Sequence, residues 1–215
     1  MTDVVLDPLE DFVARARHRL LTAPPAYDLA AMARLKGDHA LSGTPGTYVP
    51  ARDPRQAAVL VPIVARPEPG ILFTLRATTL SHHAGQISFP GGRVDPGDAD
   101  ERAAALREAD EEVGLSAASI TPLGYLDGYL SGTGFWIVPV VALVAPDYGL
   151  TLNPAEVQEA FEVPLAFLMT PENHQRQWRE RDGVQRQFYA MPYEDRFIWG
   201  ATAGMLRTLY ERIYL

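Results

Sequence analysis

The chain has 215 residues, of which 47% are hydrophobic and 21% charged, with no cysteine and a formal net charge of −8. This length suits one domain with a sizeable core, the acidic balance excludes a basic nucleic-acid-binding surface, and the lack of cysteine excludes thiol catalysis, disulfides and thiolate metal sites. The acidic N-terminus does not resemble a secretory signal and no apolar run approaches the ~20 residues that span a membrane, so we expect a cytoplasmic protein.

The first fifty residues differ in character from the rest of the chain. Apolar residues at helical spacing over 9–21 predict a short amphipathic helix. Residues 23–56 are rich in proline and glycine and show no sustained period, which is typical of an extended arm. We therefore expect a helix and arm over 1–50 and a single domain over 51–215.

Strand signals dominate the next part of the chain. The apolar segments 57–65 and 71–77 are separated by a turn and predict a β-hairpin, and residues 81–88 follow as a loop. A final amphipathic helix is expected at 199–215. Further strands or hairpins are predicted at 120–130, at 135–144, in the first part of 157–169, and at 176–193 around Asp182 and Gly183. Interleaved strands and helices predict a mixed sheet covered by helices, which is an α/β fold, or α+β in strict terms.

A helix predicted over 99–113 carries a cluster of glutamates. Glu108, Glu111 and Glu112 stand at positions i, i+3 and i+4, so they project from one side. Glutamates at this spacing usually form a solvated face, and their like charges repel by a few tenths of a kcal/mol. A divalent cation such as Mg²⁺, which takes oxygen ligands, would remove that repulsion. The spacing alone leaves both interpretations open.

The residues around these glutamates also carry structural signals. Asp98 is suited to cap the helix, with Glu101 as the reciprocal partner of a capping box. Ala104 and Ala105 lie one turn before the glutamates on the same side, and we expect their small side chains to leave space for a ligand.

The segment GGRVDPGDADERAAALREADEEVGL resembles the Nudix box, whose pattern is Gly, five residues, Glu, seven residues and then Arg-Glu-apolar-x-Glu-Glu-x-Gly-apolar. The second half of the pattern matches residues 107–115. The first half departs from it, because Asp98 stands five residues after Gly92 in place of Glu, and eight residues rather than seven separate Asp98 from Arg107.

The resemblance implies a Nudix-type α/β/α sandwich with a mixed β-sheet and the metal-dependent hydrolysis of a nucleoside diphosphate derivative. It implies that Glu108 and Glu112 are the principal ligands of Mg²⁺ or Mn²⁺. Glu111 is implied to complete the metal shell or to orient water, and Arg107 to fix the rotamer of a box carboxylate.

The same resemblance assigns further contacts. Gly91 and Gly92 are implied to let the backbone approach the metal and the phosphates. Glu111 is a possible general base, and Glu156 or Glu159 could approach from outside the box, although we expect these two to be exposed charges before a strand.

The segment LFTLRATTLSHHAGQISFPGG, which precedes the box, resembles the signature of the coenzyme A (CoA) pyrophosphatase branch of the family. That signature reads Leu-Leu-Thr-x-Arg, Ser or Ala, three residues, Arg, three residues, Gly, three residues, Phe-Pro-Gly-Gly. Two positions depart from it, since Phe73 replaces a Leu and Ser81 stands where the second Arg is expected. SGTGFWIVPVVAL and FIWGATAGML extend the resemblance over 55–209. The implied reaction is hydrolysis of CoA, or of an oxidised or acylated CoA, to 3′,5′-ADP and a phosphopantetheine product.

The substrate contacts implied by this branch come from several elements. Arg76 is implied to contact a phosphate, and His82 or His83 to touch the 3′-phosphate or act in proton transfer. Phe197 and Trp199 are candidates for stacking on adenine, but we expect large aromatic residues at the start of an amphipathic helix to pack in the core.

Other functions remain open on the sequence. Because Ser81 replaces an expected Arg, ADP-ribose, NADH or a nucleoside-sugar are alternative substrates, and a non-catalytic nucleotide-binding regulator is an alternative of a different class. The N-terminal arm and the hairpin at 175–193 are candidates for contacting the pantetheine group or for a homodimer contact. We expect a nucleotide-type small molecule as partner, and neither nucleic acid nor a membrane.

Overall fold

The computed structural model describes residues 8–30, 35–41, 53–80, 83–181 and 184–215. In chain order the elements are α1 (Pro8–Arg19), β1 (Lys36–Gly37), the 3-10 helix η2 (Asp38–Ala40), β2 (Arg55–Val64), β3 (Gly70–Arg76), β4 (Ile87–Ser88), β5 (Gly91–Arg93), α2 (Glu101–Val113), η3 (Ala117–Ser119), β6 (Ile120–Tyr125), β7 (Tyr129–Leu130), β8 (Phe135–Val144), β9 (Val157–Pro164), α3 (Leu165–Leu168), η4 (Pro171–Asn173), β10 (Gln175–Arg181), β11 (Val184–Tyr193), β12 (Arg196–Trp199) and α4 (Ala201–Tyr214).

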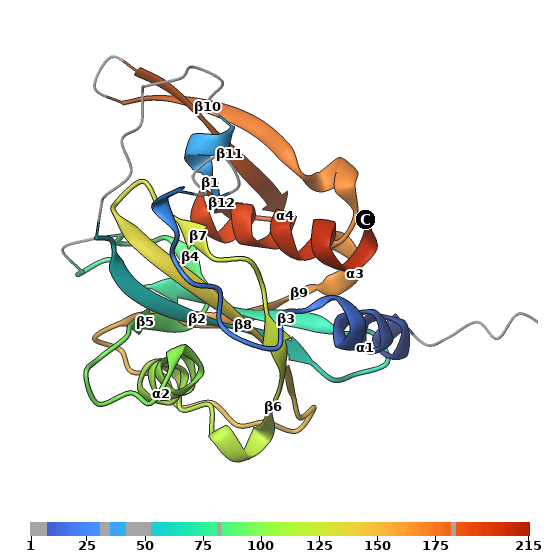
Figure 1. Cartoon of the computed structure of the whole chain (residues 1–215). Coiled ribbons are helices and arrows are strands. Elements are labelled where there is room, and N and C mark those ends of the chain that lie inside the picture. The colour runs from blue at the N-terminus through green and yellow to red at the C-terminus, as the bar shows by residue number, and fades with distance from the viewer. Residues whose placement is uncertain (1–7, 31–34, 42–52, 81–82, 182–183) are drawn as a thin grey trace, which may run out of the picture.

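Two sheets organise the described residues (Figure 1): a nine-stranded mixed sheet, and a separate antiparallel sheet of β10, β11 and β12. The main sheet has the order β1-β7-β8-β2-β3-β4, with β5 added to β2, β6 to β8 and β9 to β3. Its centre is the parallel pair β2 and β8, in register from Arg55 opposite Phe135 to Val64 opposite Val144. These two strands are largely apolar, as expected where a parallel pair is covered on both faces.

Helices cover the main sheet on both sides (Figure 1). α2 lies on one face, and α1, α4 and the second sheet lie on the other. Side chains alternate between the faces along β2. Leu60 belongs to the hydrophobic cluster that holds α2, whereas Val61 belongs to the cluster that holds Leu206 of α4. This three-layer arrangement confirms the α/β/α sandwich with a mixed sheet that the sequence predicts.

The hairpin predicted from 57–65 and 71–77 is wrong in its extent. Only Ile63 pairs with Ile71 and Val64 with Gly70. β2 instead pairs along its whole length with β8, and β3 pairs with β9. Strands distant in the sequence therefore replace the local partner, because the core needs β2 at the centre of the sheet.

Other predicted elements are present with local differences. The strand expected over 120–130 is divided into β6 and β7, and the loop expected over 81–88 ends in the short strand β4. The hairpin around residues 182–183 is confirmed in β10 and β11, although these two turn residues lie outside the described part of the chain. β12, directly before α4, was not predicted.

The expectation that Ala104 and Ala105 leave room for a ligand is wrong. Both residues are fully buried in the cluster between α2 and the main sheet. Their short side chains instead let α2 lie close to β2, in the dense packing of a protein interior.

The N-terminal helix lies on the main body of the fold. Phe12 and Ala16 of α1 are fully buried in the cluster that includes α4. In the arm, β1 adds to β7 in parallel, and the ring of Tyr27 meets that of Trp136 at a centroid distance of 5.3 Å. Of the helices that the structure describes, none has the length and apolar character needed to cross a membrane.

Candidate active site

The start of α2 differs from the predicted capping box. Asp100 is the N-cap residue, and its carboxylate accepts a hydrogen bond from the Ala103 backbone N at 2.7 Å. The predicted capping pair of Asp98 and Glu101 is therefore wrong. The additional residue in the loop places Asp100 at the cap and leaves Asp98 to bind Arg107.

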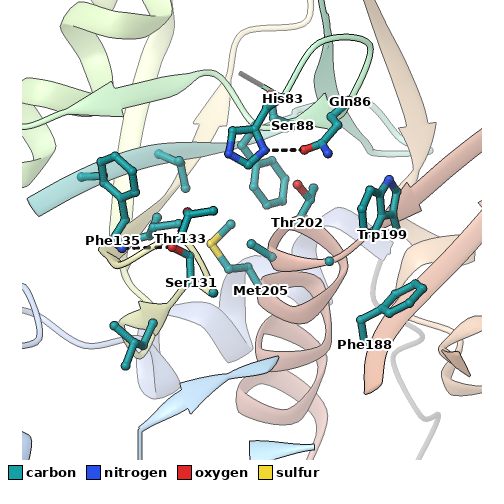
Figure 2. A pocket seen from close by; sticks show the side chains of 18 of the residues that line it. His83, Gln86, Ser88, Ser131, Thr133, Phe135, Phe188, Trp199, Thr202 and Met205 are labelled. Carbon is teal, nitrogen blue, oxygen red and sulfur yellow. Dashed lines mark hydrogen bonds between the residues drawn. The ribbon is translucent and has the colours of Figure 1, made fainter. Parts of the chain in front are cut away.

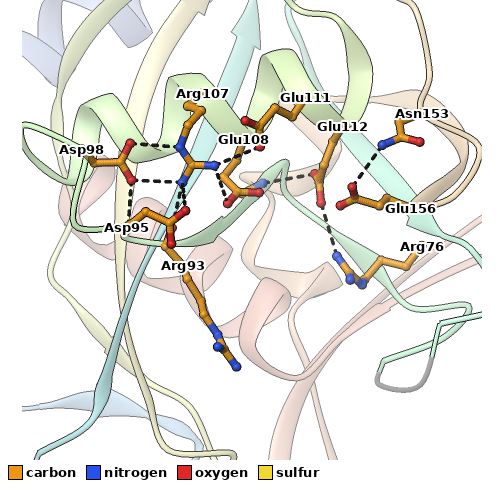
Figure 3. Close-up of polar contacts among 11 residues, drawn as sticks. Arg76, Arg93, Asp95, Asp98, Arg107, Glu108, Glu111, Glu112, Asn153 and Glu156 are labelled. Atoms are coloured by element: carbon orange, nitrogen blue, oxygen red, sulfur yellow. Dashed lines mark hydrogen bonds and ion pairs between the residues drawn. The ribbon is translucent and has the colours of Figure 1, made fainter.

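Arg107 connects the loop to the glutamates of α2 (Figure 3). Its Nε and Nη2 donate to the two oxygens of Asp98 at 3.0 Å each, and Nη2 also donates to the Arg93 carbonyl at 3.1 Å. Its Nη1 donates to Glu108 at 3.0 Å and to Glu111 at 2.9 Å. The hydrogen bonds to Asp98 and Glu108 raise the pKa of Arg107, and Arg107 lowers the pKa of Asp98. Arg107 thus contacts the box carboxylates that the sequence pairs with it.

Glu108 lies against the diglycine turn. A Cβ at residue 92 would lie 2.3–2.5 Å from the carboxyl atoms of Glu108, so only glycine leaves room for this carboxylate. Gly91 has a φ of +154°, and a Cβ there would meet the backbone of β2 at 2.5 Å. Burial raises the pKa of Glu108, and Arg107 opposes that shift.

Glu112 is nearly buried, with 2% of its side chain exposed. Its carboxylate accepts hydrogen bonds from the Gly91 N–H at 3.2 Å and from Arg76 Nη1 at 3.3 Å. Burial raises the pKa of Glu112 to about 7. The Arg76 charge and the Gly91 N–H oppose this shift. The negative charges of Glu108 and Glu156 add to it.

The three candidates for the general base differ in their surroundings. Glu111 is 55% exposed and is held by the Arg107 guanidinium. Glu159 has both carboxylate oxygens bound by Arg196, at 2.8 Å each. Glu156 lies beside Glu112 on the approach to the buried carboxylates (Figure 3).

A metal ion would have to be held by Glu108 and Glu112, with further oxygen ligands. In the described part of the chain, no three carboxylate or imidazole side chains stand close enough to enclose an ion. The donor chemistry nevertheless fits a hard cation, because both carboxylates are withdrawn from water beside the Gly91–Gly92 backbone and a cation would favour their ionised forms. Arg76 Nε is also buried without a hydrogen-bond partner among these residues.

A cavity of about 740 Å³ is lined by both sheets and by the start of α4 (Figure 2). Ala57, Val59 and Ile137, which alternate with residues packed under α2, line it from the main sheet. Phe188 and Trp199 line it from the second sheet. The volume is typical of sites for small molecules.

The cavity and the glutamates meet at the diglycine turn. Arg76, Gly91 and Gly92 line the cavity, and these same three residues touch the carboxylates of Glu112 or Glu108. A ligand in the cavity can therefore present one group to these carboxylates across the turn.

The loop that precedes β4 contributes His83 to the cavity lining. His83 is exposed and has a φ of 57°, and its Nδ1 lies 2.7 Å from the Gln86 Oε1 (Figure 2). The neighbouring candidates Ser81 and His82 lie outside the described residues.

The expectation that Phe197 and Trp199 pack in the core is wrong. Phe197 is 42% exposed. Trp199 lines the cavity, where its ring meets that of Phe188 at a centroid distance of 5.4 Å. The sequence analysis also missed Phe188 and Phe135 as cavity residues. No local spacing marks them, because they line the cavity from two different sheets, Phe135 from β8 and Phe188 from β11.

Comparisons with known proteins give one family. The sequence model of the NUDIX domain matches residues 54–188, which is more than half of the chain. The uncharacterized Nudix hydrolase NudL of Cronobacter sakazakii is 46% identical over 159 residues, covering 74% of this chain and 83% of the relative. The protein of the same name from Escherichia coli is 44% identical over the same shares.

Solved structures also resemble part of the chain. A crystal structure of a C. elegans Ap4A hydrolase is 23% identical and covers 51% of this chain and 80% of that protein, with a TM-score of 0.45. The domain match and the identity to the NudL proteins show that the chain belongs to the Nudix family of hydrolases, which act on pyrophosphate bonds of nucleoside diphosphate derivatives.

Proposed function

We propose that the protein hydrolyses the diphosphate of CoA, or of a CoA derivative, to 3′,5′-ADP and a phosphopantetheine product. The observation that carries this proposal is the position of Arg76. Arg76 belongs to the segment that resembles the CoA pyrophosphatase signature, lines the cavity, and donates to Glu112 of the Nudix box at 3.3 Å. The substrate signature and the box thus converge on one ion pair at the edge of the cavity.

The chemistry requires water to attack one phosphorus atom of the P–O–P linkage. The attacked phosphate gains the hydroxyl, the bridging oxygen leaves with the other phosphate, and a base takes the proton of the water. Nudix hydrolases generally use divalent metal ions, and a bound Mg²⁺ or Mn²⁺ neutralises the diphosphate and lowers the pKa of water. Glu108 and Glu112 would hold the ion.

The remaining residues bind, orient and accept the proton. Arg107 is a positioning residue, because it fixes Glu108, Glu111 and Asp98 at once. Glu111 is our first candidate for the group that orients the water and accepts its proton. To act as the base, the Glu111 carboxylate would have to give up part of its ion pair with Arg107. The exposed position of the Glu111 side chain allows this movement.

Glu156 is the second candidate for the base. It lies beside Glu112 and is not engaged by an arginine among the described residues, in contrast to Glu159. Comparison of Glu111→Gln and Glu156→Gln in single-turnover experiments separates the two roles. The base variant lowers the rate of the chemical step and removes the acidic limb of its pH profile, whereas the other variant keeps that limb.

Contacts to the substrate follow from the cavity lining. Arg76 would donate to the diphosphate, and the Gly91–Gly92 backbone would approach it without side-chain obstruction. His83, exposed on the loop above the cavity, would contact the nucleotide side of the substrate.

A substrate panel tests the proposal. Purified protein with Mg²⁺ or Mn²⁺ is offered CoA, ADP-ribose, NADH and a nucleoside-sugar in parallel, and the products are separated by chromatography. We expect CoA to give 3′,5′-ADP with the highest kcat/KM. A higher kcat/KM for ADP-ribose, NADH or the sugar would overturn the CoA assignment, and binding without cleavage would favour a regulator on the same fold.

A further inference from the structure

The cavity concentrates positive charge in an acidic protein. Four arginines line it, and Glu180 is the single acidic residue among its described lining residues. The chain as a whole has a net charge of −8. The four arginines are Arg76, Arg93, Arg179 and Arg186. Such a local excess favours a ligand that carries negative charge in more than one place.

Two of these arginines face each other on the second sheet. Arg179 of β10 and Arg186 of β11 are directly opposite in the antiparallel register. Like charges at such a position destabilise a sheet. No carboxylate of the described residues forms an ion pair with either guanidinium. The pair thus costs stability in the free protein, and an anion between the two side chains would offset that cost.

Aromatic rings continue the same face of the second sheet. Phe188 follows Arg186 by two residues, so their side chains share a face, and Trp199 lies on the neighbouring strand. The Phe188 and Trp199 rings are 5.4 Å apart, and the Arg179 guanidinium lies 5.6 Å from the Trp199 ring centroid. The aromatic rings can stack on a flat base, and the guanidinium groups beside them can bind a nearby anion.

The arginine pair and the diglycine turn line one cavity from different elements. Arg76, Gly91 and Gly92 belong to the main sheet, whereas Arg179 and Arg186 belong to the second sheet. We propose that Arg179 and Arg186 form a second anion site, which binds a phosphate monoester that the substrate carries in addition to its diphosphate. This inference rests on the proposed function, since CoA carries such a group on its ribose.

Kinetics with two substrates test the site. CoA and dephospho-CoA, which lacks the 3′-phosphate, are compared in the wild type, in Arg186→Ala and in the double variant Arg179→Ala/Arg186→Ala. We expect the ratio of kcat/KM for CoA to that for dephospho-CoA to fall about 10- to 100-fold, mainly through the KM for CoA, because hydrogen bonds to charged groups are lost. An unchanged ratio would overturn the proposal.

Two further arginine variants are matched controls for the anion site. Arg176→Ala removes an arginine from the same strand as Arg179, but Arg176 lies beside Tyr189 and does not line the cavity. We expect this variant to keep the wild-type ratio. If Arg93→Ala instead lowers the ratio while Arg186→Ala does not, the second phosphate binds at the main sheet and the proposal is wrong. Removal of Arg186 also relieves the charge repulsion with Arg179, so the Tm of Arg186→Ala should not fall below that of the wild type.

A binding experiment separates this inference from the proposed function. Calorimetric titration with 3′,5′-ADP and with 5′-AMP needs no turnover. We expect the wild type to bind 3′,5′-ADP at least tenfold more tightly than 5′-AMP, and the double variant to lose this preference. If CoA is not hydrolysed but the preference is present and is lost in the variant, the proposed reaction fails and the anion site stands. Equal binding of the two nucleotides by the wild type would overturn the anion site.

Discussion

At the scale of single residues, the contact between Gly92 and Glu108 links the shape of the backbone to the chemistry of the site. The absence of a side chain at residue 92 gives the Glu108 carboxylate its place beside the turn. Since that carboxylate is the mobile end of a side chain, a methyl group at residue 92 would displace it without disrupting the core.

Gly92→Ala should therefore reduce activity more than stability. We expect kcat/KM to fall at least tenfold and the metal concentration for half-maximal activity to rise, because ligand geometry tolerates little displacement. The Tm should stay within a few degrees of the wild-type value. Gly97→Ala is the matched control, since a Cβ at residue 97 meets no atom within 4 Å. Equal loss of activity in both variants would contradict the assignment of Glu108.

The buried carboxylate of Glu112 predicts a pH dependence of stability in the metal-free protein. Its pKa is about 7 in the folded chain against 4.5 for an ordinary glutamate. The folded chain thus binds the proton more tightly, so Glu112 stabilises the fold below pH 4.5 and this contribution is lost as the pH rises to 7. The loss amounts to roughly 3 kcal/mol at most.

Urea unfolding in the presence of a chelator measures this effect. Between pH 4.5 and 7 the free energy of unfolding should fall more steeply in the wild type than in Glu112→Gln, which cannot titrate. Parallel curves for the two proteins would show that Glu112 is not buried as described.

At the residue scale, the sequence placed three glutamates together on one helix but did not predict how far each is buried. Helical spacing places Glu108, Glu111 and Glu112 near one another, but it does not say which of them points toward the sheet. In the structure their side chains are 16%, 55% and 2% exposed, respectively. This difference depends on the packing of α2 against β2, which no local pattern encodes.

At the scale of elements, the loop before α2 divides two tasks between two aspartates. Asp100 caps the helix, and Asp98 binds Arg107. The spacing to Glu101 had favoured Asp98 as the cap, two residues before the observed N-cap Asp100. The helix start was therefore predictable to within two residues, while the role of each acidic side chain was not.

Alanine substitution of Asp100 should affect stability more than activity, and alanine substitution of Asp98 should affect activity more than stability. Asp100→Ala should lower the free energy of unfolding by about 1 kcal/mol through loss of the cap, with little effect on kcat. Asp98→Ala should lower kcat/KM about 10- to 100-fold, because Arg107 is no longer fixed against the glutamates. Thermal unfolding and steady-state kinetics measured together decide this. A larger loss of kcat/KM in Asp100→Ala than in Asp98→Ala would contradict these two roles.

The length of an element decided whether the sequence revealed it. A periodic pattern of apolar residues can be recognised only in an element of sufficient length. The elements long enough are α1, α2, α4, β2, β8 and the β10–β11 hairpin. β1, β4, β5, β7 and β12 have two to four residues each. Such short strands form where a neighbouring strand offers unpaired backbone groups, so their positions depend on the assembled sheet rather than on local propensity.

At the scale of the whole molecule, the candidate active site lies where three layers meet. α2 supplies the carboxylates, the main sheet supplies the diglycine turn and Arg76, and the second sheet closes the cavity with Phe188 and Trp199. The sequence predicted the first two contributions through the Nudix box and the segment before it. It could not predict the third, because the placement of the second sheet depends on packing between elements distant in the chain.

The measurement that tests the central claim most directly compares product formation from CoA by the wild type and by Glu112→Gln at equal Mg²⁺. We predict that the wild type releases 3′,5′-ADP and that the variant does so more slowly by a factor of about 10³ or greater, because the proposed metal ligand Glu112 is lost. The variant should keep a wild-type Tm, since an uncharged amide suits the buried position of Glu112. Equal rates of release by the two proteins would contradict the assignment of the carboxylates to catalysis.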